Sequence, residues 1–77
     1  MKFTKTQGRY LAFIHGYTKI HGCPPAERDM QIYFRVAASS IHQMVLTLEK
    51  NGLISRVPRQ PRSIHLLVPK EEIPQLD

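Results

Sequence analysis

The sequence has little of what marks a secreted or membrane protein. Its single cysteine, Cys23, has no partner for an internal disulfide, which is typical of chains kept in a reducing compartment. The apolar runs are short, and the run from Tyr10 to Ile14 falls far below the roughly 20 residues that a transmembrane helix needs. We therefore expect a cytoplasmic protein without a membrane span or a cleaved signal sequence.

Acidic residues are also scarce, and this argues against catalysis. Before residue 71 the chain contains only Glu27, Asp29 and Glu49. Glu27 and Asp29 are two residues apart, so they cannot share one face of a helix as a pair of catalytic carboxylates would. The sequence also has no glycine-rich phosphate loop and no nucleophile elbow. We predict no catalytic residues and no enzyme activity.

The four histidines and the cysteine do not form a metal-binding pattern. His15 and His21 are six residues apart and miss the i, i+4 spacing that brings two ligands to one face of a helix. Cys23, His42 and His65 follow no recognised ligand spacing. No metal ion and no other cofactor are expected.

Positive charge is what the chain has in excess. Residues 1–70 contain all 11 lysines and arginines against three acidic residues, a net charge of +8, which is typical of a protein that binds a polyanion. The segment 69–77 carries three negative charges, and Pro69 and Pro74 within it predict an extended or disordered acidic tail. At 77 residues the chain forms one domain, expected to span residues 1–68.

Two helices are predicted in the first half of the chain. Thr4 and Gln7 have the spacing of a capping box, which starts a helix over about 6–21 that Gly22 ends. A short second helix is expected at about 26–34, where two acidic residues near its start suit the helix dipole.

The third predicted helix is the most informative. Expected over 38–51, it places four apolar side chains on one face: Ile41, Met44, Val45 and Leu48. Asn51-Gly52 supplies the left-handed residue that ends it. The connection from the second helix lacks the glycine that is usual in a helix-turn-helix. Because the Ala37-Ala38 pair offers no capping side chain, the cap is expected to shift to Ser39.

Two apolar stretches then predict an antiparallel hairpin. Residues 53–57 have strand character, residues 64–68 alternate apolar with other side chains, and the prolines of 58–61 form a turn with Arg59 at its tip. Three helices followed by a hairpin give a mainly α fold with a small antiparallel β-hairpin, the layout of a winged helix-turn-helix. The core is expected to contain Leu11, Ile14, Met30, Phe34, Ile41, Val45, Leu48, Ile54, Ile64 and Leu66.

Three short patterns carry a resemblance to a known family. They are Gly22-x-Pro24-Pro25, then Leu46-x-Leu48-Glu49-x-x-Gly52-Leu53-Ile54, and finally Arg62-Ser63-Ile64-x-Leu66. Together they resemble the N-terminal DNA-binding domain of the LexA repressor family over roughly residues 4–68. The resemblance implies that the third helix enters the major groove of DNA and that the wing lies along the phosphates. We expect a stand-alone module without the family's self-cleaving peptidase domain.

The resemblance also implies which side chains touch the DNA. By position, the residues that face the bases are Ser39, Ser40, His42 and Gln43. A glutamine suits this role, because its amide can form two hydrogen bonds to adenine, worth about 1–3 kcal/mol of discrimination. The expected phosphate contacts are basic residues of the wing and its neighbours: Arg56, Arg59, Arg62, Lys50 and Arg35. The alternative for both sets is an ordinary solvated surface.

The predicted function is that of a double-stranded DNA-binding transcriptional regulator, which reads the major groove with helix 38–51 and contacts phosphates with the wing 54–68. Because one such module buries little surface on DNA, a weak homodimer or paired binding on two half-sites is expected. A protein-interaction adaptor on the same scaffold is the first alternative, since a fold does not determine a function. RNA binding is the second alternative, and it would require an exposed aromatic stacking surface.

Overall fold

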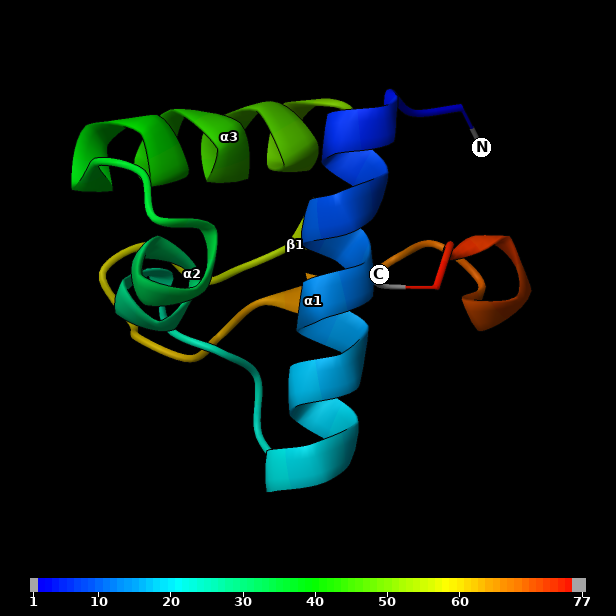
Figure 1. The fold of residues 1–77 in the computed structure, drawn as a ribbon, viewed down its shortest axis with the longest axis horizontal. Helices are drawn as coiled ribbons and strands as arrows, with labels where there is room; N and C mark the ends of the chain where they lie inside the picture. Colours follow the sequence, from blue (N-terminus) through cyan, green and yellow to red (C-terminus); the bar gives the residue numbers. More distant parts are fainter. Residues whose placement is uncertain (1, 76–77) are drawn as a thin grey trace.

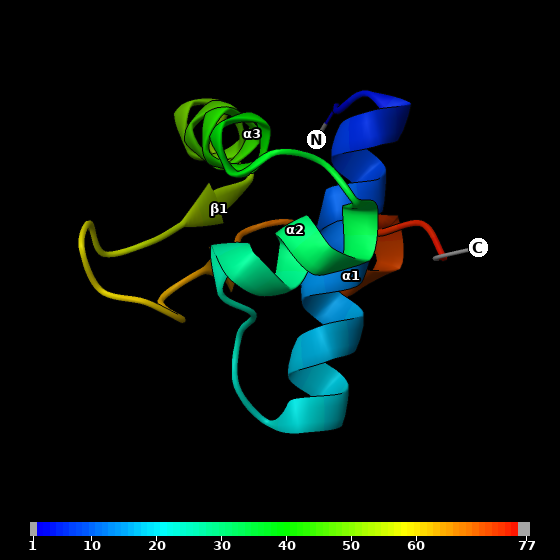
Figure 2. The same cartoon turned by 60° about the vertical axis from the view of Figure 1, so that its left-hand side comes forward.

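A computed structural model describes residues 2–75 of the chain (Figure 1). Its elements follow in the order α1 (Lys5–His21), α2 (Glu27–Phe34), α3 (Ala38–Lys50), β1 (Ile54–Ser55), β2 (His65–Leu66) and a 3₁₀ turn, η1 (Lys70–Glu72). The helix α3 lies near the upper end of α1, and the loop between β1 and β2 extends beneath α3 (Figures 1 and 2). This is the predicted winged helix-turn-helix, with the segment 54–68 as the wing.

The ends of α1 have the expected caps. The Thr4 hydroxyl accepts a hydrogen bond from the Gln7 amide at 3.0 Å, and the Gln7 side chain accepts one from the Thr4 amide at 2.9 Å, so the predicted capping box is confirmed. At the other end, Gly22 takes a left-handed conformation with φ 76° and donates its N–H to the carbonyl of Thr18.

The turn between α2 and α3 is built without glycine. Arg35 takes the left-handed position instead, with φ 57°, and its N–H donates to the carbonyl of Gln31 at 2.9 Å. The predicted shift of the next cap to Ser39 is wrong. The carbonyl of Ala37 already accepts from the amides of Ser40 and Ile41 at 3.0 and 3.2 Å, so helical hydrogen bonding begins at Ala38.

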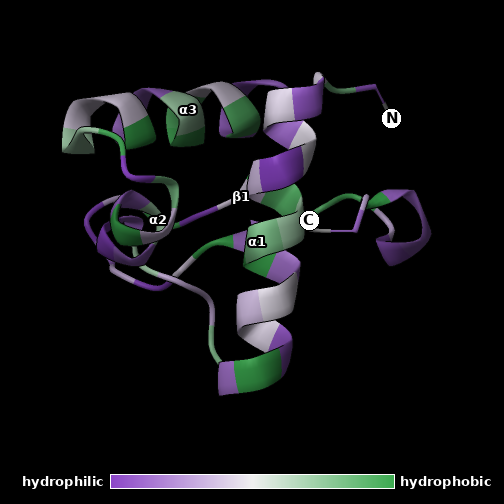
Figure 3. Cartoon of the chain, in the orientation of Figure 1, coloured by the Kyte–Doolittle hydropathy of each residue, from purple (hydrophilic) through white to green (hydrophobic). Residues whose placement is uncertain are grey.

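The core lies where α1, α2, α3 and the hairpin meet. Eight of the ten predicted core residues are buried, and Phe34 and Leu66 pack against the cluster while remaining partly exposed. The core also contains five buried apolar residues outside that prediction: Tyr10, Phe13, Leu53, Val68 and Ala12. Figure 3 shows the apolar residues of α3 on the side that faces the rest of the molecule. The helix therefore presents its polar side to solvent.

The hairpin is shorter than the sequence predicts. Strand pairing is limited to Ile54 with Leu66 and Ser55 with His65, in antiparallel register. Beyond these pairs, the Ser63 hydroxyl accepts from the Val57 amide at 3.0 Å, and the carbonyl of Val57 accepts from the Gln60 amide. Since Val57 is bonded within the loop and the two prolines of 58–61 have no N–H to donate, the ladder stops at Ser55.

The tail differs from the extended segment predicted for 69–77. Lys70–Glu72 forms one 3₁₀ turn, which lies on the far side of α1 from α2 (Figure 1). Ile73, the next residue, packs against the core. Gly8 makes this approach possible, because a Cβ there would lie 3.1 Å from both Phe3 and Pro74. Apolar burial of Ile73 therefore folds the tail back despite its prolines. Residues 76–77 of the predicted tail lie outside the described part of the chain.

Candidate nucleic-acid interface

One exposed face of α3 gathers most of the residues predicted to contact bases. Ser39, Ser40 and Gln43 line a shallow depression together with Met44 and Thr47. Ser39 and Gln43 are four residues apart and so lie one turn apart on the same side of the helix. Within residues 2–75, no side-chain hydrogen bond caps this helix, which leaves both serine hydroxyls available to an outside partner.

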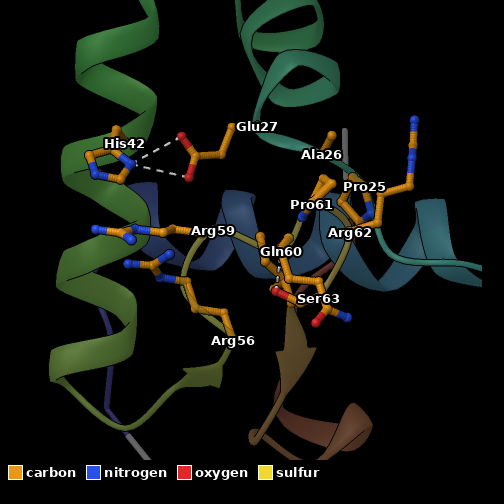
Figure 4. A pocket seen from close by; sticks show the side chains of 11 residues that line it. Pro25, Ala26, Glu27, His42, Arg56, Arg59, Gln60, Pro61, Arg62 and Ser63 are labelled. Carbon is orange, nitrogen blue, oxygen red and sulfur yellow. Dashed lines mark hydrogen bonds and ion pairs between the residues drawn. The ribbon is translucent and has the colours of Figure 1, made fainter.

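His42, the fourth predicted base contact, has a different environment. It faces a cleft of about 470 Å³ between the first turn of α2, the side of α3 and the wing (Figure 4). Its Nδ1 lies 3.2 Å from each carboxylate oxygen of Glu27, the first residue of α2. Sequence reasoning did not include Glu27 in the site. The two residues are fifteen positions apart, and no local pattern links them.

Two of the three wing arginines are tied to the helices. The Arg56 Nε donates to Glu49 of α3 at 3.0 Å, and only 15% of the Arg56 side chain is exposed. Arg62 donates from Nη1 to the Tyr17 hydroxyl at 3.0 Å and forms an ion pair with Asp29 at 3.1 Å. The hydrogen bond to Tyr17 raises the pKa of the Arg62 guanidinium above its ordinary value. These contacts hold both ends of the loop against the helical body.

Arg59 differs from its two neighbours. It lies at the exposed tip of the wing, and within residues 2–75 its side chain makes no hydrogen bond or ion pair. Its φ is 65°, and Pro58 precedes it in a turn that the Gln60 amide closes on the Val57 carbonyl, the pattern of a type II turn. Figure 4 shows its guanidinium on the same side of the cleft as His42 and Arg56, whereas Arg62 points away from them.

The remaining predicted phosphate contacts lie at the ends of helices. Lys50 is in the last turn of α3, seven residues after Gln43 and on the same side of the helix. Arg35 is exposed at the end of α2 and shares a shallow groove with Arg28. Sequence reasoning omitted Arg28, although its seven-residue spacing from Arg35 on one helix was a usable signal.

Other kinds of site find little support in the described residues. Between residues 2 and 75, no three His, Cys, Asp or Glu side chains come together in a way that could hold a metal ion. In the same part of the chain, no helix is long and apolar enough to span a bilayer.

These elements define a winged helix-turn-helix domain: a short helix, a turn, a helix with an exposed polar face and a wing that carries arginines. The family model of the LexA DNA binding domain matches residues 1–63, so the chain belongs to this family. The match confirms the predicted resemblance. It is a match to a DNA-binding domain and not to a catalytic one, in agreement with the prediction that the chain is not an enzyme.

Three curated relatives illustrate the similarity. The LexA repressor of Thermosipho melanesiensis is 38% identical over 94% of this chain, and that of Bacillus subtilis is 39% identical over 96%. The LexA repressor of Exiguobacterium sibiricum is 39% identical over 92% of the chain. The matched segment covers 36%, 37% and 35% of these relatives, respectively, so the chain spans about a third of their length.

Proposed function

We propose that this chain is a transcriptional regulator that binds double-stranded DNA, with α3 in the major groove and the wing along the phosphates. The observation that carries the proposal is the exposed polar face of α3, which is free for outside contacts and flanked by cations. An α-helix with its side chains is about 10–12 Å across and fits a major groove about 12 Å wide. Such a regulator would work in the cytoplasm.

The face of α3 supplies the groups for base recognition. Gln43 is exposed at its centre and suits a bidentate contact with adenine, while Ser39 and Ser40 suit bases or phosphates near the start of the helix. His42, on the cleft side, offers a ring nitrogen to the same groove. We therefore keep all four as proposed base contacts.

The wing and the helix ends supply the groups for phosphate binding. Arg59 is the strongest candidate, because its side chain is exposed and makes no hydrogen bond or ion pair with another described residue. Lys50 and Arg35 are exposed as well. Arg56 and Arg62 remain candidates, with part of their charge compensated by Glu49 and Asp29. If four to six phosphates are neutralised, the slope of log affinity against log salt should be about −4 to −5.

The aromatic residues favour duplex DNA over RNA as the ligand. An RNA-stacking surface needs exposed rings, but here the rings pack on one another. Tyr10 stacks on Phe34 with ring centroids 4.2 Å apart, and Phe13 packs against Tyr33 at 4.6 Å. Of these four, Tyr33 alone is largely exposed, at 42%.

Binding as a pair is the second part of the proposal. A single small module buries little surface on DNA, so we propose that two copies occupy neighbouring half-sites, as a weak dimer or side by side. To distinguish paired binding from binding of a single copy, the protein is titrated separately with duplexes that contain one or two copies of a preferred half-site. The two-site duplex should take up two molecules with higher affinity for each.

The proposal is tested by NMR titration with random-sequence duplex DNA at two salt concentrations. The amide signals of residues 39–47 and 56–62 should shift, and the shifts should weaken at the higher salt concentration. Absence of shifts at low salt would contradict DNA binding. Failure to bind DNA together with binding to a protein partner would favour the adaptor alternative.

A further inference from the structure

The contact between His42 and Glu27 has a chemical consequence for the groove-facing side of α3. The Nδ1 atom of His42 lies 3.2 Å from both Oε1 and Oε2 of Glu27, and the two side chains are 50% and 37% exposed. A carboxylate can only accept hydrogen bonds, so Nδ1 must carry the hydrogen. The contact therefore selects the Nδ1–H form of the imidazole.

In the neutral ring, the other nitrogen is then an acceptor. A neutral imidazole carries one N–H, so when it sits on Nδ1 the Nε2 atom presents a lone pair. In Figure 4 the second ring nitrogen of His42 points away from Glu27 and out of the side-chain cluster. With α3 in the major groove, this nitrogen would meet the edges of the bases.

We propose that Glu27 is a positioning residue that determines base preference, by holding His42 as a hydrogen-bond acceptor in the major groove. The inference rests on the proposed DNA-binding function. In the major groove the hydrogen-bond donors are the exocyclic amino groups of adenine and cytosine, whereas guanine and thymine offer acceptors. His42 should therefore favour adenine or cytosine at the base it faces.

The charges around the cleft support a role for Glu27 beyond charge balance. Arg56 and Arg59 line the same cleft and already supply cations for phosphates. A carboxylate beside them repels phosphates and lowers affinity for DNA of any sequence. The simpler role for Glu27 is to stabilise the positive end of α2, where it is the first residue. The two roles predict different results. Positioning of His42 depends on the acceptor oxygen of Glu27, whereas stabilisation of the α2 terminus depends on its negative charge.

The first test is the tautomer of His42 in the free protein, measured by long-range ¹H–¹⁵N correlation at alkaline pH. The native chain should show the Nδ1–H form, and Glu27→Ala should revert to the Nε2–H form that a solvated histidine prefers. Glu71→Ala is the matched control. It removes the same charge from η1, on the far side of α1, and should leave the tautomer unchanged. An Nε2–H form in the native chain would overturn the inference.

The second test is selection of bound duplexes from a randomised library. Glu27→Ala and His42→Ala should both reduce the preference for adenine or cytosine at the same base position. The expected reduction is about fivefold, which corresponds to the free energy of one hydrogen bond. Affinity for random duplex should stay equal or rise for Glu27→Ala, because a repulsive charge is lost. Equal weakening on all sequences would overturn the inference in favour of the structural role.

Glu27→Gln separates the acceptor from the charge. Its amide oxygen can still accept from Nδ1–H, so the tautomer and the base preference should persist although the carboxylate is gone. Loss of both in Glu27→Gln would contradict the inference. If the native chain shows the Nδ1–H form but binds no duplex, the proposed function fails and the local geometry stands. If the native chain binds duplex DNA but shows the Nε2–H form, this inference is rejected and the proposed DNA-binding function stands.

Discussion

The third helix and the wing form one surface, but different forces hold them in place. The helix α3 is fixed by Ile41, Val45 and Leu48, each 0% exposed in the core. The wing is fixed by polar contacts: Arg56 to Glu49, Arg62 to Asp29 and Tyr17, and the Ser63 hydroxyl to the backbone of the loop. Burial of large apolar side chains contributes more free energy than partly exposed ion pairs do.

This difference matches the roles that we propose for the two regions on DNA. Short side chains such as Ser39 and Gln43 read a base only when their helix is held within a fraction of an ångström. A long arginine at the tip of the wing tolerates more movement, because a phosphate offers several acceptor oxygens. The helix is therefore suited to specificity, and the wing to affinity.

The largest effect should follow from removing the apolar anchor of α3. Ile41→Ala opens a cavity beneath the helix and should lower the free energy of unfolding by about 2–5 kcal/mol. Urea denaturation measures this, with Ser39→Ala as the control on the opposite face, expected within about 0.5 kcal/mol of the native chain. A loss for Ile41→Ala no larger than for Ser39→Ala would refute the comparison.

A smaller effect should follow from removing the polar anchor of the wing. Ser63 is 6% exposed and accepts from the Val57 amide, so Ser63→Ala leaves that N–H without its partner. We expect a stability loss of about 1 kcal/mol and faster hydrogen exchange confined to the wing. Ser55→Ala, at an exposed strand position, is the matched control. Faster exchange spreading through α3 would show that the two regions are not held independently.

The smallest effect concerns the turn that leads into α3. Arg35 has φ 57°, a conformation that costs a residue with a side chain about 1 kcal/mol or more, whereas glycine adopts it freely. Arg35→Gly should therefore be more stable than Arg35→Ala by about 1 kcal/mol in thermal or urea unfolding. Both variants lose the same proposed phosphate contact and should weaken DNA binding alike. Equal stability of the two would contradict the assignment of strain to this turn.

Much of the fold was predictable because it depends on local signals. The capping box at Thr4, the left-handed Gly52 and the apolar spacing from Ile41 to Leu48 all act within a few residues. The family match confirms the fold and the resemblance read from three short patterns. The cap of α3 was predicted wrongly at Ser39, because Ala37 caps with its backbone carbonyl and leaves no side-chain signature.

The site was less predictable, because its features join residues that are distant in sequence. The pairing of Glu27 with His42, of Asp29 with Arg62 and of Gly8 with Pro74 each depends on tertiary packing. From sequence, the three wing arginines were equivalent. The structure separates the exposed tip, Arg59, from the two that are tied to the helices.

The proposed roles, specificity for the helix and affinity for the wing, are tested most directly by comparing Gln43→Ala with Arg59→Ala. Each variant is titrated with a preferred and a random duplex over a range of salt concentrations. Gln43→Ala should lose about 1–3 kcal/mol of discrimination between the duplexes and keep the native salt dependence. Arg59→Ala should bind both duplexes more weakly by the same factor, with a salt slope smaller by about 1. Uniform weakening by Gln43→Ala, or loss of discrimination in Arg59→Ala, would contradict the account.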